Sequence, residues 1–413
     1  MTYSETLEYL YNAAPAFEKV GAGAYKEGLS NTLALDEHFG HPHRRYKTIH
    51  VAGTNGKGST SHMLAAILQT CGYKVGLFTS PHLIDFNERI RVNGKPMPHQ
   101  YLIDFVEQER DFFEPLYPSF FELTTALAFK YFAEQQVDIA VIEVGLGGRL
   151  DCTNIITPEL SVITNISFDH TGFLGDTLEK IAGEKAGIIK SGIPVVIGEY
   201  VDETRPVFER KAEEMGAPVL FAQDMKFTHI PDCQLKGYCQ EKNVRTVLCA
   251  AEILKEKGII KDDKNIAEGI AHVCDLTKIR GRWETLREKP LVICDTGHNL
   301  GGWQILSRQI ADRYEQVRKS GGTLRIVFGM VDDKDIDNVL KLLPQEAVYY
   351  FTQADTHRAI PVMSLIEKAK SEGLEGNAYS SVAEAYDAAI HDASSEDFIF
   401  VGGSSYVVAD LLS

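Results

Sequence analysis

The sequence lacks the features that mark several protein classes. Its seven cysteines form neither a Cys-x-x-Cys pair nor a Cys/His cluster, so neither a zinc site nor a disulfide framework is indicated. No apolar run is long enough to cross a bilayer, and the first residues, MTYSETLEYL, show neither a basic start nor a long apolar stretch. We therefore expect a cytoplasmic protein with reduced cysteines.

Positive charge is also scarce. The chain has 42 Lys and Arg against 58 Asp and Glu, which gives a formal net charge of −16. Such an acidic surface does not attract nucleic acid or an anionic membrane, so neither is expected as a partner. An anionic ligand must then be held by a few placed cations. We expect small-molecule partners only, and a monomer.

The composition is that of an ordinary globular protein, with 44% apolar residues. A chain of 413 residues is longer than a single hydrophobic core usually accommodates, so two domains are expected. Short β-branched runs alternate with segments of helical period, which is typical of parallel βαβ units. The first runs are KTIHVAG, YKVGLFTS, DIAVIEVGL, LSVITNIS, IPVVIGE and APVLFA. A second series, after Lys289, comprises PLVICDTG, TLRIVFGM, EAVYYFTQA and DFIFVGGS.

Between the two series lies a charged, glycine-interrupted stretch from Lys278 to Lys289, which is the best candidate for a hinge. We expect an α/β fold of two domains. Residues 1–285 should form a mostly parallel sheet domain of the P-loop type, and residues 286–413 a smaller Rossmann-like α/β domain.

The strongest local signal is a glycine-rich turn between the run KTIHVAG and the apolar pattern MLAAILQT. Glycines let successive backbone N–H groups point at phosphate oxygens, and the start of a helix adds its dipole. The strict P-loop pattern would place glycine at Val51 and Ser or Thr at Gly58. Phosphate binding is nevertheless favoured over a merely structural turn. The loop consists of Gly53, Thr54, Asn55, Gly56, Lys57, Gly58, Ser59 and Thr60.

The loop AGTNGKGS resembles that of the Mur ligase superfamily, and further motifs resemble its folylpolyglutamate synthase and dihydrofolate synthase branch. These motifs are TSPHL (79–83), FNERI (86–90), EVGLGGRLD (143–151), DH (169–170), EKAGI (184–188), GR (281–282), HN (298–299) and RA (358–359). The resemblance implies an ATP-dependent ligase that adds L-glutamate to the carboxylate of dihydropteroate, of a reduced folate, or of both, through an acyl phosphate. It assigns ATP to residues 1–285 and glutamate to residues 286–413.

Glu143 ends the apolar run DIAVIE, where open α/β sheets place their ligands. A carboxylate there is costly without a charged partner, so a metal ligand is favoured over a structural ion pair. By resemblance, Ser80 and Glu143 hold one Mg²⁺, and His170 helps to hold a second. Lys185 matches a lysine that the family carries as a carbamate; a simple salt bridge is the alternative. K⁺ or another monovalent cation is a further expected cofactor.

The remaining assignments rest on the resemblance. Lys57, His170, Lys185 and His298 are expected to be catalytic. Asn243 and Asp295 are expected to contact adenosine, and Arg282 a phosphate. The alternative roles are a strand-end cap for Asp295 and a surface charge in the linker for Arg282. Arg358 is expected to pair with a carboxylate of glutamate. The expected pterin contacts are Gly28, Leu29, Ser30, Phe121, Glu122, Leu123, Thr124, Leu150, Asp151 and Cys152. Phe121 could equally be a core residue.

Two other functions compete with this interpretation. Another Mur ligase, acting on a nucleotide-linked peptidoglycan precursor, would share the chemistry but is expected to carry a further N-terminal domain. A P-loop switch or assembly ATPase would hydrolyse ATP independently of glutamate, and it explains neither the motif around Glu143 nor the second domain.

Overall fold

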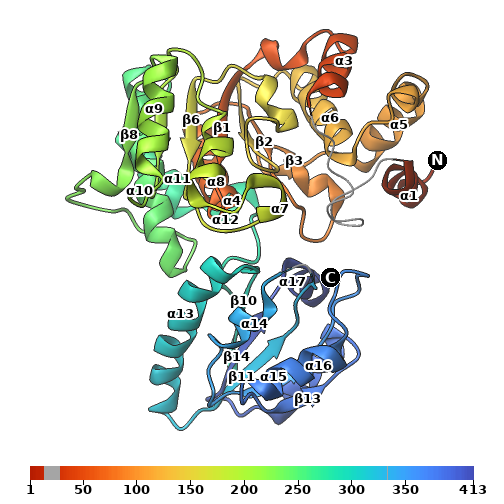
Figure 1. The fold of residues 1–413 in the computed structure, drawn as a ribbon, viewed down its shortest axis with the longest axis vertical. Coiled ribbons are helices and arrows are strands. Elements are labelled where there is room, and N and C mark those ends of the chain that lie inside the picture. The colour runs from red at the N-terminus through yellow and green to blue at the C-terminus, as the bar shows by residue number, and fades with distance from the viewer. Residues whose placement is uncertain (14–27, 333) are drawn as a thin grey trace. The chain divides into compact units, whose positions relative to one another are not determined.

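The computed structural model describes residues 1–13, 28–332 and 334–413. The chain forms two compact units, the first from Met1–Gln234 and Gln240–Ile279, the second from Leu235–Cys239 and Arg280–Ser413 (Figure 1). The main division, after Ile279, falls in the expected hinge stretch. The expected boundary after residue 285 falls inside a strand, β9 (Glu284–Glu288).

An eight-stranded sheet forms the centre of the first unit, in the order β4-β3-β2-β5-β1-β6-β7-β8. All six strand runs expected in this unit are present, and they run parallel to one another. Only β3 and β4 are antiparallel additions at the edge. The strands are β1 (Lys47–Ala52), β2 (Val75–Phe78), β3 (Ile90–Val92), β4 (Lys95–Pro96), β5 (Ile139–Glu143), β6 (Leu160–Ile163), β7 (Val195–Ile197) and β8 (Val219–Phe221).

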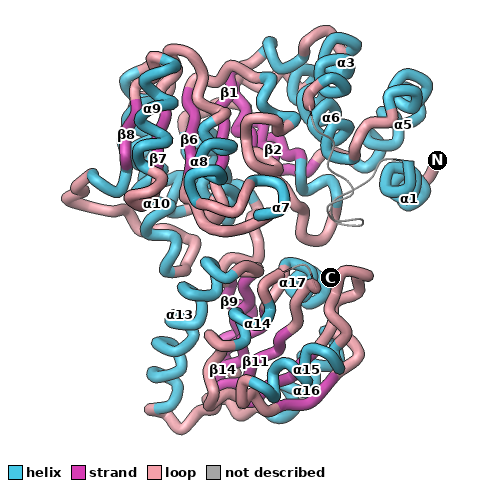
Figure 2. Tube along the Cα trace, in the orientation of Figure 1, coloured by secondary structure: helices cyan, strands magenta, loops and turns pink. Residues whose placement is uncertain are grey.

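Helices flank the strands of this sheet (Figure 2). They are α1 (Tyr3–Ala13), α3 (Ser30–His38), α4 (Lys57–Thr70), α5 (His99–Phe113), α6 (Phe120–Glu134), α7 (Thr171–Leu174), α8 (Leu178–Ala186), α9 (Arg205–Met215), α10 (Tyr238–Glu256), α11 (Asp263–Ala271) and α12 (Val273–Thr277). Short 3₁₀ turns are η2 (Pro42–Arg45), η3 (Phe86–Arg89), η4 (Glu114–Leu116), η5 (Cys152–Ile155) and η6 (Ala222–Asp224). No helix within the described ranges combines the length and apolar character needed to cross a membrane.

The central strands are buried on both faces. Ala140 and Ile142 of β5 belong to one apolar cluster with residues of α5 and α6, whereas α4 also contacts β5 and is itself covered by α11 and α12. A second cluster joins β6 and β7 to α8 and α9. Strands covered on both sides read as continuous apolar runs, which is why the sequence pattern identified them.

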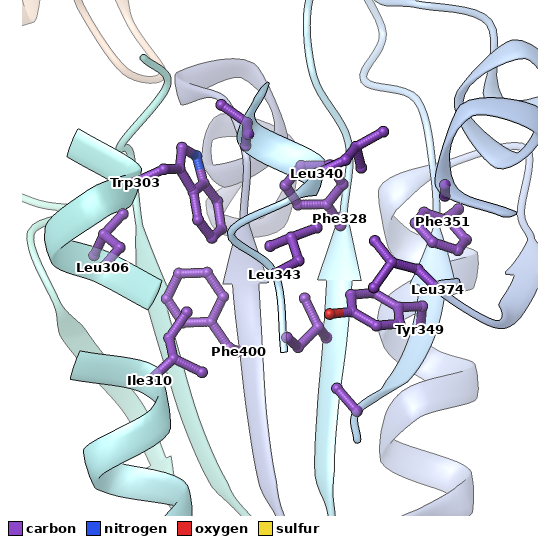
Figure 3. Close-up of a cluster of buried hydrophobic side chains, with 14 of the residues drawn as sticks. Trp303, Leu306, Ile310, Phe328, Leu340, Leu343, Tyr349, Phe351, Leu374 and Phe400 are labelled. Carbon is purple, nitrogen blue, oxygen red and sulfur yellow. The ribbon is translucent and has the colours of Figure 1, made fainter. Parts of the chain in front are cut away.

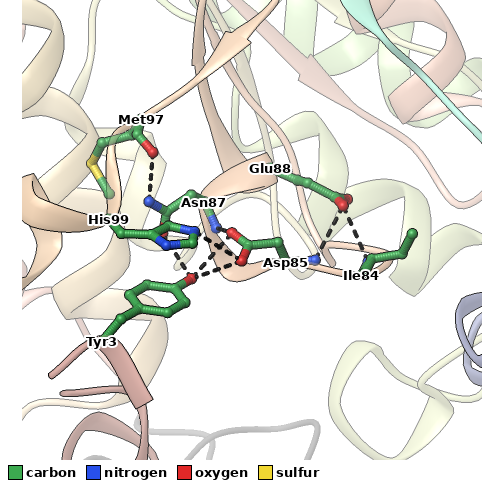
Figure 4. Close-up of polar contacts among 7 residues, drawn as sticks. All are labelled: Tyr3, Ile84, Asp85, Asn87, Glu88, Met97 and His99. Atoms are coloured by element: carbon green, nitrogen blue, oxygen red, sulfur yellow. Dashed lines mark hydrogen bonds and ion pairs between the residues drawn. The ribbon is translucent and has the colours of Figure 1, made fainter. Parts of the chain in front are cut away.

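A polar cluster fixes the turn that follows β2. Asp85 and Glu88 form a capping box at η3, and Glu88 also accepts a hydrogen bond from the N–H of Ile84 (Figure 4). The N–H of Leu83 donates to Glu88 as well. The hydroxyl of Tyr3, from α1, donates to Asp85 at 3.1 Å, and the ring of His99, at the start of α5, stacks on Tyr3. The turn that carries Ser80 is therefore held from two helices.

The second unit has a six-stranded sheet in the order β13-β12-β11-β14-β10-β9, in which only β9 is antiparallel. Its other strands are β10 (Leu291–Asp295), β11 (Leu324–Phe328), β12 (Val348–Phe351), β13 (Gly376–Ala378) and β14 (Phe398–Gly402). Its helices are α13 (Leu300–Arg318), α14 (Ile336–Leu340), α15 (Val362–Ser371), α16 (Val382–Asp392) and α17 (Ser405–Leu412). Trp303, Leu306 and Ile310 of α13 pack toward Phe328 and Phe400 of the sheet (Figure 3).

Both units thus have the α/β architecture expected from the sequence, which confirms the fold class. The additional strand β9 lies in the expected hinge stretch and is rich in charged residues, mostly exposed. Charge on an edge strand hinders pairing with another chain, and it hides the strand from an apolar pattern.

Candidate active site

The expected nucleotide and metal residues of the first unit gather at one edge of its sheet. Ser80, Glu143 and Gly53 follow or end β2, β5 and β1, which are adjacent strands, and Thr164 follows β6 on the other side of β1. Because these strands are parallel, their carboxyl ends lie at the same edge, where open α/β sheets place their ligands. The sheet therefore brings together residues that are up to 111 positions apart, from Gly53 to Thr164.

The phosphate loop is fixed by the segment that follows β6. The N–H of Thr54 donates to the carbonyl of Asn165 at 3.0 Å, and the N–H of Asn55 donates to the Asn165 side-chain oxygen at 2.8 Å. The Thr164 hydroxyl donates to the Asn55 carbonyl at 2.6 Å, and Ser167 and Thr54 exchange two further hydrogen bonds. These contacts use the first N–H groups of the loop for structure.

The part of the loop that offers N–H groups for an anion is consequently the start of α4. Gly56 caps this helix with φ 83°, and the first N–H groups of a helix, here those of Lys57, Gly58 and Ser59, have no partner within it. A row of such N–H groups together with the helix dipole favours an anion. Of the eight expected loop residues, Thr54 and Asn55 thus have N–H groups bonded to Asn165, whereas Lys57, Gly58 and Ser59 have N–H groups without a partner inside the helix.

Glycine is required at two loop positions. A Cβ on Gly53, at φ 146°, would lie 1.8 Å from the Thr164 hydroxyl oxygen. A Cβ on Gly56 would lie 2.3 Å from the side-chain oxygen of Asn243. Asn243, on α10, is therefore beside the loop; its amide donates to Gln240, whose own amide donates to the Ser59 hydroxyl at 3.2 Å.

Two lysines converge on the loop. The amines of Lys57 and Lys185 each donate to the carbonyl of Gly53 at 3.0 Å, and Lys57 also reaches the carbonyl of Thr54 at 3.2 Å. Lys185 is only 4% exposed. Burial, helped by the positive charge of Lys57, lowers the pKa of Lys185 to about 7. Its amine is therefore half deprotonated near neutral pH.

Glu143 is 3% exposed at the end of β5 and accepts a hydrogen bond from the backbone N–H of Ser80 at 3.1 Å. The structure therefore brings together these two expected metal ligands. His170 has a left-handed backbone conformation, with φ 50°, and its backbone N–H donates to the carboxylate of Asp169 at 2.9 Å. Within the described ranges, no three side chains of His, Cys, Asp or Glu group as a metal site.

The expected pterin contacts divide into two sets. Glu122 closes a capping box with Ser119 at the start of α6, Leu123 lies in the apolar core, and the Thr124 hydroxyl donates to its own helix. Phe121 instead lies against the loop after β5, where a Cβ on Gly145 would come within 2.4 Å of its ring.

The second set lies in or next to that loop, or at the start of α3. Asp151 is buried and accepts hydrogen bonds from the N–H groups of Leu146 and Thr153; burial raises the pKa of its carboxyl group, whereas these bonds lower it. Leu150 and Cys152 are its neighbours, and burial raises the pKa of the Cys152 thiol well above its usual range. Gly28, Leu29 and Ser30 precede or begin α3, whose Asn31 donates to Glu122 at 3.4 Å.

In the second unit, the expected residues lie at the carboxyl edge of its sheet. Asp295 ends β10 and accepts hydrogen bonds from the N–H groups of Trp283, at 2.7 Å, and Gly297, at 2.8 Å. Arg282 donates to the Thr296 hydroxyl. Burial raises the pKa of Asp295, although the charge of Arg282 acts in the opposite direction. The ring of His298 bonds to the Thr296 carbonyl at 3.1 Å.

Arg358 lies beside two of the neighbouring strand ends. Its carbonyl accepts a hydrogen bond from the N–H of Asp332, just after β11, and its guanidinium donates to the hydroxyl of Tyr406, just after β14, at 3.1 Å. Asp295 pairs with Gly402 of β14 in the sheet register. All four expected residues of this unit, including Arg358, therefore occupy one sheet edge.

Comparison with known proteins agrees with this arrangement. Residues 51–229 match the Mur ligase middle domain, and residues 281–405 match the Mur ligase, glutamate ligase domain. The dihydrofolate synthase/folylpolyglutamate synthase of Bacillus subtilis is 35% identical over 424 residues, covering 94% of each chain. The chain belongs to this family. The family and the class of ligase expected from the motifs are thereby confirmed.

Solved structures of this family superimpose closely on the chain. E. coli FolC in complex with DHPP and ADP has a TM-score of 0.84 at 30% identity, covering 100% of this chain and 97% of that one. A bifunctional folylpolyglutamate synthase/dihydrofolate synthase with Mn, AMPPNP and L-glutamate bound has a TM-score of 0.82 at 29% identity, covering 100% and 97%.

Sequence reasoning assigned no role to several residues that build this site. Thr164 and Ser167 hold the phosphate loop, and Gln240 reaches Ser59 from α10. These contacts join segments more than 100 positions apart, so no local pattern reveals them. Glu122 was assigned to the pterin, but its role in the capping box could have been predicted, because Ser119 stands three positions before it.

Proposed function

We propose that this chain joins L-glutamate to the free carboxylate of dihydropteroate, of a reduced folate, or of both, and that it consumes ATP with Mg²⁺. The observation that carries the proposal is the convergence of Lys57 and Lys185 on the Gly53 carbonyl, at the carboxyl edge where Glu143 also ends its strand. Relatives solved with ADP, AMPPNP, Mn, DHPP and L-glutamate support the choice of ligands.

The reaction needs an oxygen of the pterin carboxylate to become a leaving group. That oxygen attacks the γ-phosphorus of ATP, the bond from the γ-phosphorus to the bridging oxygen breaks, and ADP leaves. The amine of glutamate then attacks the carbonyl carbon of the acyl phosphate, loses a proton and expels phosphate. Charge on the phosphates must be balanced throughout, which positioned cations and backbone N–H groups can do.

The residues of the first unit suit these needs. The N–H groups at the start of α4 would hold phosphate oxygens, and Lys57 would neutralise their charge. Mg²⁺ prefers oxygen ligands and usually keeps several waters, so the Glu143 carboxylate and the Ser80 hydroxyl, with phosphate oxygens, make a fitting set. His170 is proposed to help hold a second ion. When bound, the ions supply positive charge where the phosphoryl group is transferred.

We also propose that Lys185 is carbamylated. A half-deprotonated amine near pH 7 can attack carbon dioxide, forming an N–C bond and releasing a proton, and the pKa of Lys185 lies at about 7. The product is an oxygen ligand in place of a buried cation. A simple ion pair is the alternative that this proposal must displace. A bound K⁺ or other monovalent cation stays a prediction.

In the second unit, Arg358 is proposed to pair with a carboxylate of glutamate, because its planar guanidinium suits bidentate carboxylate binding. His298 is proposed to act near the incoming amine. Arg282, Asn243 and Asp295 are proposed to contact the nucleotide. Both carboxylate oxygens of Asp295 already accept backbone hydrogen bonds, so this residue would act as a strand-end cap and as a nucleotide contact at once.

The test measures ADP release with dihydropteroate or tetrahydrofolate, each with and without L-glutamate. The proposal predicts release that requires both a pterin and glutamate. Release that is the same without glutamate would identify an ATPase and contradict the proposal. Activity with only one pterin would decide which of the two ligations this chain performs.

A further inference from the structure

His50 is a buried titratable residue to which neither the motifs nor the proposed chemistry gives a task. It lies in the middle of β1, three residues before Gly53, and is 0% exposed. Its Nε2 lies 2.8 Å from the hydroxyl oxygen of Thr153. Within the described ranges its Nδ1 has no hydrogen-bond partner. A polar ring in this place requires a reason, since buried polar groups are costly.

The directions of the hydrogen bonds around Thr153 are determined by chemistry. The hydroxyl of Thr153 donates its single proton to Oδ1 of Asp151, which also accepts from the N–H of Thr153 at 3.0 Å. The hydroxyl oxygen can therefore only accept from His50, so the proton of the ring sits on Nε2. Two consecutive hydrogen bonds, each with a fixed direction, therefore connect His50 to Thr153 and Thr153 to Asp151.

The ring is neutral in this chain. Burial, together with the positive charge of Lys190, lowers the pKa of His50 to about 3. Lys190 itself donates to the carbonyl of Asn154 at 2.8 Å, next to Thr153. The ring thus stays neutral near pH 7, with its single proton on Nε2, and adds no charge to the buried strand.

Asp151 passes this constraint to the loop 145–151. Its Oδ2 accepts from the N–H of Leu146 at 2.8 Å, and its own N–H donates to the carbonyl of Gly148 at 3.2 Å. The loop begins two residues after Glu143 and packs against the ring of Phe121 through Gly145. The strand that leads into the phosphate loop therefore also sets the position of the loop expected to bind the pterin.

We propose that His50 is a positioning residue for the pterin, which fixes the loop 145–151 through Thr153 and Asp151. This inference rests on the proposed function, because it needs a pterin at that loop. It assigns His50 no contact with substrate, and it predicts that the pterin affinity, and not the nucleotide affinity, depends on the chain of hydrogen bonds.

The experiment titrates dihydropteroate into AMPPNP-saturated protein by calorimetry, and AMPPNP alone in a separate series. Thr153→Val removes the hydroxyl at nearly constant shape, and Thr153→Ser keeps it. His50→Leu removes the donor, and His50→Gln keeps an N–H near the place of Nε2. Thermal unfolding shows which variants are folded; should His50→Leu not fold, the two Thr153 variants decide alone.

We expect Thr153→Val and His50→Leu to weaken dihydropteroate binding by up to about tenfold, the scale on which the loss of one hydrogen bond acts. Thr153→Ser and His50→Gln should stay within about twofold of the natural protein, and AMPPNP affinity should not change in any variant. Equal pterin affinity in Thr153→Val and Thr153→Ser would overturn the inference, as would a parallel loss of AMPPNP binding. A natural protein that binds AMPPNP but no pterin would instead contradict the proposed function, and this inference with it.

Discussion

Replacing Lys185 by methionine should stabilise the ligand-free protein while abolishing ligation. The amine is buried, and its pKa is about 7 instead of 10.5. At about 1.4 kcal/mol per pKa unit, keeping the ammonium buried costs roughly 5 kcal/mol below pH 7. The hydrogen bond from Lys185 to the Gly53 carbonyl offsets about 1.5–3 kcal/mol of this cost. We therefore expect a net gain of roughly 2–3.5 kcal/mol for Lys185→Met.

The pH dependence gives the sign of this effect. Above pH 7 the native amine is neutral, whereas the unfolded chain still binds the proton up to pH 10.5, so the stability of the natural protein rises with pH in this window. Methionine does not titrate. The advantage of the variant should be largest at pH 6 and should shrink steadily toward pH 9.

The assay is denaturant unfolding between pH 6 and 9, in buffers freed of carbon dioxide. Leu365→Met, a substitution in the core of the other unit, serves as the matched control with no expected dependence on pH. Adding bicarbonate should stabilise the natural protein but not Lys185→Met if the carbamate forms. A variant that is less stable than the natural protein at pH 6, or whose difference is constant with pH, would refute this reasoning.

Three further predictions concern the loop and the metal ligands. Asn165→Ala leaves the N–H of Asn55 without its acceptor and should weaken AMPPNP binding about tenfold, by calorimetry, with pterin binding unchanged. Glu143→Gln should leave the unfolding temperature within a few degrees yet abolish ADP release; normal turnover would contradict its role as a metal ligand. Gly56→Ala should lose nucleotide affinity, measured by calorimetry, because its Cβ would approach the Asn243 side chain and because φ at Gly56 is 83°; an unchanged affinity would contradict the requirement for glycine at this position.

Much of this molecule could be predicted from its sequence, for identifiable reasons. The ten expected strands are apolar runs, most of them buried, and the structure has a strand in each of these runs. Strand β13 (Gly376–Ala378) has no β-branched residue, and β9 is charged, so periodicity could not detect them. Glu143 could be placed at the ligand-binding edge because it ends an apolar parallel strand, whereas Ser80 was assigned to the same metal by the family resemblance. The partners of Thr54 could not, because a loop-to-loop hydrogen bond leaves no period in the sequence.

The anchoring of the phosphate loop on Asn165 has a consequence for the kinetics of nucleotide binding. The amide protons of Thr54 and Asn55 are already held by protein acceptors, so the first half of the loop requires no ordering when ATP arrives. In an exchange experiment in heavy water, these two amides should be slow with or without nucleotide, whereas those of Lys57 and Gly58 should slow only once phosphate is bound. Ordering the loop then reduces the affinity for the nucleotide by less, and no separate slow step of loop ordering is expected in the association kinetics.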